Sequence, residues 1–256
     1  MKTSTTWMKC LTAASLVALT ACGGDSQTAS NGGNSAASAS VSAGPISGFG
    51  SILQNGRRYI VDDNTLVRID DNPSSSDLLE VGEFVFITSS SIDDNGNPIA
   101  DTVTQETLLK ASISSLDAAN QRFNALGQTV QVRASTVIDS SFTSAIAGTD
   151  FDRLEIGDGV EVSGYIAADG VLIATYVGYE DNVSEPRVIG KISNLNSEAL
   201  TFEINGLEVN YNTASLSSLP GNVPANGITV RVRGSLNGDI LDASTVKGFS
   251  SGFDDL

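Results

Sequence analysis

A polar turn leads into an alternating strand at residues 154–164, which read LEIGDGVEVSG. Val160 and Val162 lie two positions apart, and Glu161 between them would face the opposite side of a strand. Alternation with a period of two is typical of a half-buried β-strand, and the glycines and aspartate before it favour a tight turn. This stretch therefore predicts β-structure with little helix.

Two further stretches have the same arrangement, at residues 79–87 (LEVGEFVFI) and 226–234 (NGITVRVRG). Their turn glycines lie on either side of Gly157 with a spacing of roughly 70 residues, the kind of fixed period that marks a repeat. Dipeptides that favour hairpin turns recur in the same order; they are Asn55-Gly56, Asn95-Gly96, Asp169-Gly170, Asn205-Gly206 and Asn237-Gly238. The sequence therefore predicts three β repeats, namely the first segment (residues 44–107), the second segment (residues 108–182) and the third segment (residues 183–248).

The spacing of the turns sets the expected architecture of each segment. Turn signals recur about every 10 residues, which predicts about five short strands per segment. Short strands at this spacing favour small barrels or sandwiches over α/β units, so the expected fold class is all-β, with tandem small antiparallel β-barrels. Helical turns are expected only near residues 76–81 and 142–147, where the alternation stops.

The N-terminal residues form a predicted targeting signal. Residues 1–21 begin with Lys2 and Lys9 and continue with a short apolar run, which is the order of a secretory signal peptide. The run is too short to cross a bilayer, which needs about 20 residues. Residues 19–23, LTACG, resemble a bacterial lipobox, so Cys22 is the predicted lipid-attachment residue and the first residue of the processed chain.

A low-complexity tether is expected next. Residues 22–43 are rich in Ser, Ala and Gly, a composition that cannot form a core, so we expect them to be disordered. Gly23, rather than Asp, follows Cys22, and by resemblance to the sorting of enterobacterial lipoproteins this favours the outer membrane over the inner one. Residues 249–256 are expected to form a frayed tail, with a docking peptide that contains two phenylalanines as the alternative.

Composition excludes several classes of function. The chain of 256 residues has a net charge of −16 and no histidine. An acidic chain repels the phosphate backbone of nucleic acids, and a chain without histidine lacks the commonest general base and imidazole metal ligands. Its two cysteines, Cys10 and Cys22, both lie in the N-terminal signal region. We therefore expect no nucleic-acid partner, no metal, no cofactor and no catalytic residue in the folded segments.

Two sets of acidic residues are candidates for binding but are interpreted as turns. Residues 93–97, DDNGN, resemble a Ca²⁺ loop only in part, because Pro98 and Thr104 stand where an EF-hand needs Gly and Glu. We interpret them as a hairpin turn. Residues 62–64 and 70–72 each contain two aspartates followed by an asparagine, and we interpret them as solvated turns.

Basic and aromatic residues give two more candidate sites. Arg231 and Arg233 lie on one face of a predicted strand, where they could clamp an anion or neutralise acids across the sheet. Tyr165, Tyr176 and Tyr179 could form a stacking surface for a sugar, or cover the rim of a barrel. In both cases the structural role is the more common one.

The lipobox, the tether and the sequence GPISGFGSI at residues 44–52 together resemble a known group of proteins. With the recurrent pattern Leu-x-[Val/Ile]-Gly-[Asp/Glu]-x-Val, they are similar to bacterial lipoproteins that carry tandem copies of domain of unknown function 5666. The resemblance covers most of residues 44–248. It implies small β-barrels related to the oligonucleotide/oligosaccharide-binding fold, and it implies no activity. The third segment departs from this pattern, because Pro220, Pro224 and Asn226-Gly227 replace the Leu-x-[Val/Ile]-Gly-[Asp/Glu] turn.

These observations favour a non-enzymatic function. We expect a membrane-tethered envelope lipoprotein that acts as a binding or scaffold module. One partner is the membrane, through the lipid on Cys22, and the other is an envelope protein or a glycan. Two alternatives remain open: a glycan hydrolase that uses Asp/Glu pairs, and a calcium-dependent adhesive module.

Overall fold

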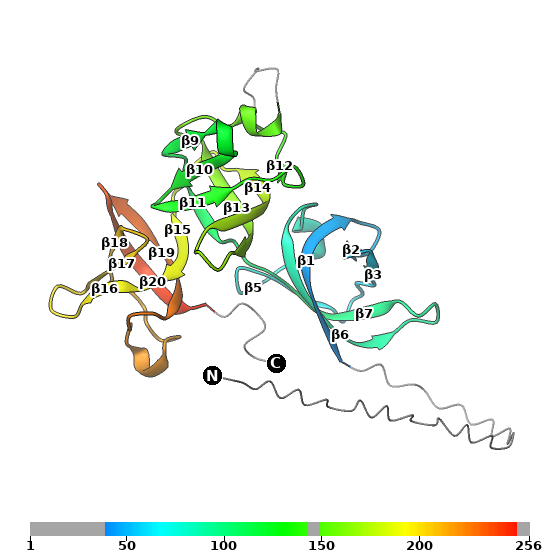
Figure 1. Cartoon of the computed structure of the whole chain (residues 1–256). Helices are drawn as coiled ribbons and strands as arrows, with labels where there is room; N and C mark the ends of the chain where they lie inside the picture. Colours follow the sequence, from blue (N-terminus) through cyan, green and yellow to red (C-terminus); the bar gives the residue numbers. More distant parts are fainter. Residues whose placement is uncertain (1–38, 143–148, 250–256) are drawn as a thin grey trace, which may run out of the picture. The chain divides into compact units, whose positions relative to one another are not determined.

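The computed structural model describes residues 39–142 and 149–249, in which the chain forms β-strands and short 3-10 helices but no α-helix (Figure 1). The all-β prediction is confirmed for these residues. Cys22, the predicted signal peptide, most of the predicted tether, residues 143–147 of the second expected helical turn and the tail after Phe249 lie outside the described residues.

The elements follow one another through the three segments. The first segment contains β1 (Ser40–Gly48), β2 (Ile52–Gln54), β3 (Arg57–Tyr59), β4 (Leu66–Ile69), β5 (Asn72–Pro73), η1 (Ser76–Leu78), β6 (Phe84–Ile92) and β7 (Pro98–Gln105). The second contains β8 (Leu109–Ser112), β9 (Ser115–Asp117), η2 (Ala118–Asn120), β10 (Arg122–Ala125), β11 (Gln128–Gln131), β12 (Val137–Ile138), η3 (Asp150–Arg153), β13 (Gly159–Ile166) and β14 (Leu172–Tyr179). The third contains β15 (Arg187–Lys191), β16 (Ser193–Asn196), β17 (Thr201–Ile204), β18 (Leu207–Asn210), η4 (Pro220–Asn222), β19 (Thr229–Asn237) and β20 (Ile240–Gly248).

The ladders follow the same order in all three segments. Each segment ends in a long antiparallel hairpin, formed by β6 and β7, β13 and β14, or β19 and β20. The first strand of that hairpin pairs with the strand that opens the segment, which is β1, β8 or β15. Each segment also has a short central hairpin, formed by β2 and β3, β10 and β11, or β17 and β18. In the second and third segments this hairpin pairs in parallel with the last strand, through β11 with β14 and β18 with β20. In the first segment the corresponding contact is a single parallel bridge between Ile60 and Ile99. The strand pairing therefore recurs with the period seen in the sequence.

These ladders form two open sheets, and neither closes into a barrel. β1 to β7 make a seven-stranded sheet, and the remaining thirteen strands make the second sheet. In the second sheet β8 pairs with β15, through Lys110↔Arg187 and Leu109↔Val188. The prediction of closed barrels is wrong for two physical reasons. The single bridge in the first segment is too short to be a closing ladder, and the β8 edge is used to join the second segment to the third.

Each segment has its own hydrophobic core. Val160 and Val162 are fully buried and Glu161 is partly exposed, as their alternation predicts. Leu126 packs against the cores of both the second and third segments, so these two segments also share apolar surface. Ile189 of the third segment belongs to the core of the second. The largest fully buried side chains are Phe123, Leu109, Ile113 and Leu172 in the second segment, Phe202, Ile189, Ile192, Ile204 and Leu241 in the third, and Ile46, Ile52 and Ile87 in the first.

The central hairpins turn as the sequence predicts in two of the three segments. Asn55-Gly56 and Asn205-Gly206 have positive φ at both residues, which a type I′ turn requires. The second segment has Leu126-Gly127 at this place, with φ of 47° and 70°. A leucine in this conformation is strained, and the contacts of Leu126 with two cores compensate for that strain.

The first strand begins earlier than the sequence predicts. The predicted tether extends to Ala43, whereas β1 starts at Ser40 and pairs with β6 from Ser40↔Ser89 onward. Backbone groups make this pairing, and the hydroxyls of Ser40 and Ser89 are 2.9 Å apart, so a polar sequence can extend the strand. The helical turn expected near residues 76–81 is confirmed as η1.

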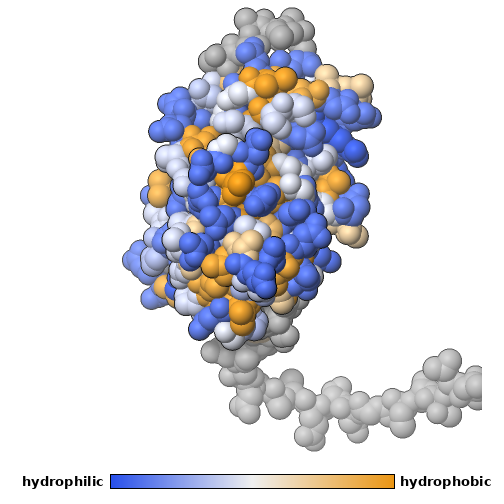
Figure 2. Space-filling model, turned by 90° about the vertical axis from the view of Figure 1, so that its left-hand side faces the viewer, coloured by the Kyte–Doolittle hydropathy of each residue, from blue (hydrophilic) through white to orange (hydrophobic). Residues whose placement is uncertain are grey.

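Apolar residues are dispersed on the face seen in Figure 2, where they lie in several areas separated by hydrophilic ones. Single exposed apolar side chains, such as Leu78, Ile156 and Val223, are ordinary on a folded protein. In the part of the chain that the structure describes, no helix is long and apolar enough to cross a membrane. A binding site is therefore better placed in a cavity than on this face.

Candidate functional site

A cavity of about 600 Å³ is lined by residues of all three segments. β6 comes from the first segment, β13 and its hairpin turn from the second, and β15 and β19 from the third. The linker between β7 and β8, Asn205 in the turn between β17 and β18, and Phe249, which follows β20, also line it. A volume of this size lies in the range of ligand pockets, roughly 300 to 1,000 Å³.

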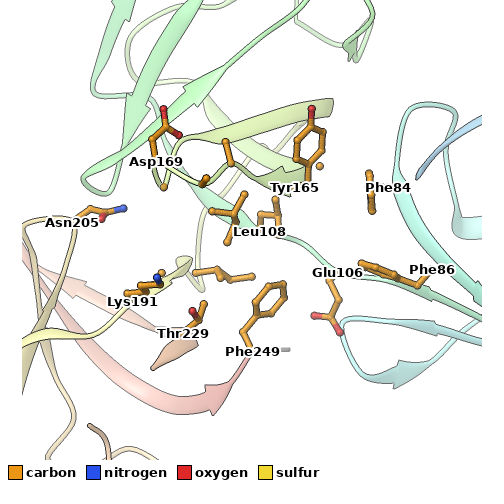
Figure 3. Close-up of a pocket in the computed structure, with 17 residues that line it drawn as sticks. Phe84, Phe86, Glu106, Leu108, Tyr165, Asp169, Lys191, Asn205, Thr229 and Phe249 are labelled. Atoms are coloured by element: carbon orange, nitrogen blue, oxygen red, sulfur yellow. The ribbon is translucent and has the colours of Figure 1, made fainter. Parts of the chain in front are cut away.

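One side of the cavity is aromatic. Phe84 and Phe86 lie two residues apart on β6 and therefore face the same side of the strand. Their rings are 5.5 Å apart and edge-on, and the Phe84 ring is 5.9 Å from that of Tyr165 on β13. Figure 3 shows these rings and Phe249 around Leu108. We call Phe84, Phe86, Tyr165 and Phe249 the aromatic wall.

The opposite side of the cavity is polar. Figure 3 shows Asp169, Asn205, Lys191 and Thr229 across from the β6 phenylalanines. The Asn205 side chain is fixed, because its amide nitrogen donates a hydrogen bond of 2.7 Å to the Gln128 side-chain oxygen. Lys191 is exposed and makes no ion pair with the described residues. The cavity can therefore receive a molecule with an apolar body and a polar end.

Charged side chains join the first segment to the third at the wall of this cavity. Asp70 and Asp71 form the turn between β4 and β5, and both have positive φ. Arg187 of β15 forms an ion pair with Asp70. Arg231 of β19 forms ion pairs with both Asp71 and Glu106, and Glu106 also lines the cavity. We call these five residues the junction cluster.

The junction cluster corrects two predictions. Asp70 and Asp71 are not a solvated turn, because they contact basic residues of the third segment, including Lys247 at 2.7 Å from Asp71. Arg231 is not an open anion clamp, since it is 5% exposed and its guanidinium is already paired. Arg233 donates to the backbone oxygen of Asp70. The arginines do neutralise acids, but these acids come from another segment and not from across the sheet.

Asp70 is held in its charged form. Burial alone would raise the pKa of its carboxyl, but the hydrogen bond and the charge of Arg187 outweigh burial and keep the pKa below the ordinary 3.8. The backbone N–H of Thr107 donates to the same carboxylate at 2.9 Å. This carboxylate therefore links the turn of the first segment to the linker and to the third segment.

The three tyrosines do not form one platform. Tyr176 is buried and donates its hydroxyl hydrogen to Glu80 at 2.6 Å. Tyr165 and Tyr179 are both 39% exposed, but Tyr165 pairs with Ile173, six positions from Tyr179 along β14. At about 3.3 Å per residue, this separates them by about 20 Å. Of the three, only Tyr165 lines the cavity.

Residues 93–97 form the hairpin turn that the sequence predicts. The Asp93 carboxylate accepts hydrogen bonds from the backbone N–H groups of Asn95 and Asn97 and from the Asn97 side chain. These hydrogen bonds lower the pKa of Asp93, and the bond from the Asn97 side chain has the largest effect. Across residues 39–142 and 149–249, no group of three His, Cys, Asp or Glu side chains is placed to hold a metal ion.

A second polar contact joins the first segment to the second. Glu83 is 7% exposed, and its carboxylate accepts the backbone N–H of Glu80 at 2.9 Å. The next backbone N–H, that of Phe84, donates to the Ser163 hydroxyl of β13. Burial raises the pKa of Glu83 to about 7, and the nearby charges of Glu161, Glu80 and Asp70 act in the same direction.

We expect the free energy of unfolding to fall as pH rises from 4.5 to about 7. Glu83 keeps its proton in the folded protein up to about pH 7, whereas in the unfolded chain it titrates at its ordinary 4.5. In this window the unfolded chain binds fewer protons than the folded one, so rising pH favours unfolding. A gap of about 2.5 between the two pKa values corresponds to about 3 kcal/mol. Urea denaturation at pH 5 and pH 8 measures the loss.

Glu83→Gln should remove most of this pH dependence, because the amide is neutral throughout. Glu198→Gln is the matched control, since Glu198 is exposed and its side chain makes no ion pair within the described part of the chain. An equal loss of stability between pH 5 and pH 8 in wild type and Glu83→Gln would show that another group is responsible.

Comparison with known proteins bears on the second segment. The family described as Domain of unknown function (DUF5666) matches residues 110–178, which begin within β8 and end within β14. The curated proteins include no match to the chain. A single copy is found, so the expectation of tandem copies over residues 44–248 is not supported by the family comparison. Residues 110–178 of this chain therefore form a DUF5666 domain, whose family has no known function.

Proposed function

We propose that the protein is a membrane-tethered envelope lipoprotein whose three segments form a non-enzymatic binding module. The observation that carries the proposal is the cavity, because residues of all three segments line it. The buried ion pairs of the junction cluster favour a fixed arrangement of that lining. A preformed site binds without the cost of ordering loops.

The lining indicates the kind of partner. The aromatic wall would bury an apolar group, and the polar side would form hydrogen bonds that orient it. An envelope protein with an exposed apolar side chain, or a glycan with an apolar face, fits this description. The net charge of −16 disfavours polyanionic partners.

The carboxylates of the cavity support binding over hydrolysis. A glycosidase needs two carboxyl groups that converge on one bond. Of the two acids among the described lining residues, Glu106 is paired with Arg231, which leaves Asp169 without a second free carboxylate there. Calcium-dependent adhesion through residues 93–97 is also less favoured, because Asp93 uses its oxygens within the turn.

The proposed tether predicts that Cys22 carries the lipid, on the outer membrane. Palmitate labelling of cells should mark the wild-type protein and leave Cys22→Ala unlabelled, because the acyl groups are attached to this sulfur. Cys10→Ala should be labelled like wild type, since Cys10 lies in the predicted signal peptide. Labelling of Cys22→Ala at the wild-type level would reject the anchor.

The cavity itself can be tested with an uncharged apolar dye, N-phenyl-1-naphthylamine. We expect one dye molecule to bind per chain, with Phe84→Ala weakening the affinity by about five-fold through loss of ring contact, or about 1 kcal/mol. Val223→Ala should bind like wild type, because Val223 is exposed outside the cavity. Fluorescence titration gives the affinities, and thermal unfolding checks that both variants are folded. Dye binding that is unaffected by Phe84→Ala would remove the cavity as the site.

A further inference from the structure

The chain leaves its last strand at the cavity. Phe249 follows β20, and its backbone N–H donates to the Thr229 oxygen at 3.0 Å, so it continues the ladder with β19. Both residues line the cavity, and Figure 3 shows Phe249 beside Leu108 and Glu106. The sequence that follows is SSGFDDL, residues 250–256.

We propose that residues 250–256 occupy this cavity as an internal ligand, with Phe253 against the aromatic wall and Asp254 or Asp255 beside Lys191. The proposal rests on the proposed function, because it assigns the first occupant of the proposed binding site. An external partner then competes with this segment for the same lining.

The length of the segment allows this placement. Phe253 lies four residues after Phe249, and four extended residues span at most about 14 Å. A roughly spherical cavity of 600 Å³ is about 10 Å across, so every part of its lining is within reach of Phe253. Gly252, directly before Phe253, permits the sharp change of direction that a return into the cavity needs.

The chemistry of the segment matches the two sides of the cavity. Phe253 supplies an apolar ring for the aromatic wall, and edge-to-face contacts between rings add to the burial of apolar area. Among the described lining residues Lys191 is the one basic residue, and it has no ion pair with the described part of the chain. In a protein with 30 acidic and 14 basic residues, such a lysine on the polar side of the cavity favours an acidic occupant.

The first test measures the dye affinity of the full chain. Phe253→Ala should increase the affinity for N-phenyl-1-naphthylamine about five-fold. If the segment leaves the wild-type cavity open for about one-fifth of the time, the apparent affinity of the wild type is about five-fold weaker than that of a permanently open cavity. Val223→Ala should leave the affinity unchanged. Equal affinities in wild type and Phe253→Ala would overturn the proposal while leaving the cavity as a binding site. Absence of dye binding in both proteins would instead reject the proposed function.

The second test traps the segment directly. Cys10 and Cys22 are the two cysteines of the chain, so replacing both with alanine gives a background without thiols. In this background Asp254→Cys, which keeps Phe253 and Asp255, combined with Thr229→Cys on the polar side of the cavity should form an intrachain disulfide under mild oxidation, whereas Asp254→Cys with Val223→Cys should not. Disulfide-linked dimers would place the segment in a second copy, and free thiols in both pairs would place it outside the cavity. Either result would contradict the proposal.

Discussion

Asp70→Ala is expected to lower the free energy of unfolding by about 4 kcal/mol, because it breaks a buried ion pair and leaves one partner uncompensated. The remaining partner, Arg187, is 6% exposed, so water cannot replace the lost carboxylate. The hydrogen bond from Thr107 is lost as well. For a protein of this size, calorimetry should record a fall in melting temperature of about 10 °C.

The controls for this prediction separate charge from packing. Asp63→Ala removes an aspartate from an exposed turn of the same segment and should change the melting temperature by less than about 2 °C. Adding Arg187→Met to Asp70→Ala should recover much of the loss, because no charge then remains buried at this point. If Asp70→Ala and Asp63→Ala unfold at the same temperature, the junction cluster does not hold the segments together.

Acid should have the same effect as the substitution. Asp70 has a pKa below 3.8 in the folded protein, so its contribution to stability is complete above that value. The contribution is lost as pH falls through the pKa of the folded state, because the protonated carboxyl no longer compensates Arg187. Below this pH the melting temperatures of wild type and Asp70→Ala should converge.

Local patterns made the secondary structure predictable. The alternation of Val160 and Val162 and the Asn-Gly turns depend only on neighbouring residues, so the strands and hairpins follow from the sequence. Closure of the sheets depends instead on pairing between distant edges. The pairing of Leu109 with Val188 has no local signal, and the prediction of barrels failed there.

The cavity was harder to predict, although one signal was present. Phe86 occupies the place in β6 that Glu161 occupies in β13 and Arg231 in β19, as the aligned ladders show. An aromatic residue where two other segments carry a charge indicates a strand face covered by another part of the chain. The ion pairs gave no such signal, because Asp71 and Arg231 are 160 positions apart and every acid in this chain is a candidate partner.

The family match and the ladders describe different levels of similarity. DUF5666 matches residues 110–178 only, whereas the order of strand pairing recurs in the first and third segments. Pairing order can persist while side chains change, since backbone groups make the ladder. We therefore expect the three segments to keep similar residues only at positions where the backbone geometry restricts the size of the side chain.

One such position is the bulge in the long hairpin of each segment. The pairing shifts after Thr88, Ser163 and Arg233, and the next residues are Ser89, Gly164 and Gly234. At Gly234 the backbone φ is not positive, so the restriction is one of space. A Cβ atom there would overlap the carbonyl oxygen of Asp242, which belongs to the backbone and cannot move aside.

Gly234→Val should therefore cost at least about 4 kcal/mol, because the overlap forces the β19–β20 hairpin apart beneath the core of the third segment. Gly164→Val should have a similar effect, since its Cβ would overlap the Ile173 carbonyl oxygen.

Ser89→Ala is the matched control at the same ladder position. Ser89 already carries a Cβ there, so this change removes only the hydroxyl contact with Ser40 and should cost about 1 kcal/mol. Urea denaturation followed by circular dichroism compares the three variants. A Gly234→Val protein as stable as Ser89→Ala would mean that the two strands do not approach at this bulge.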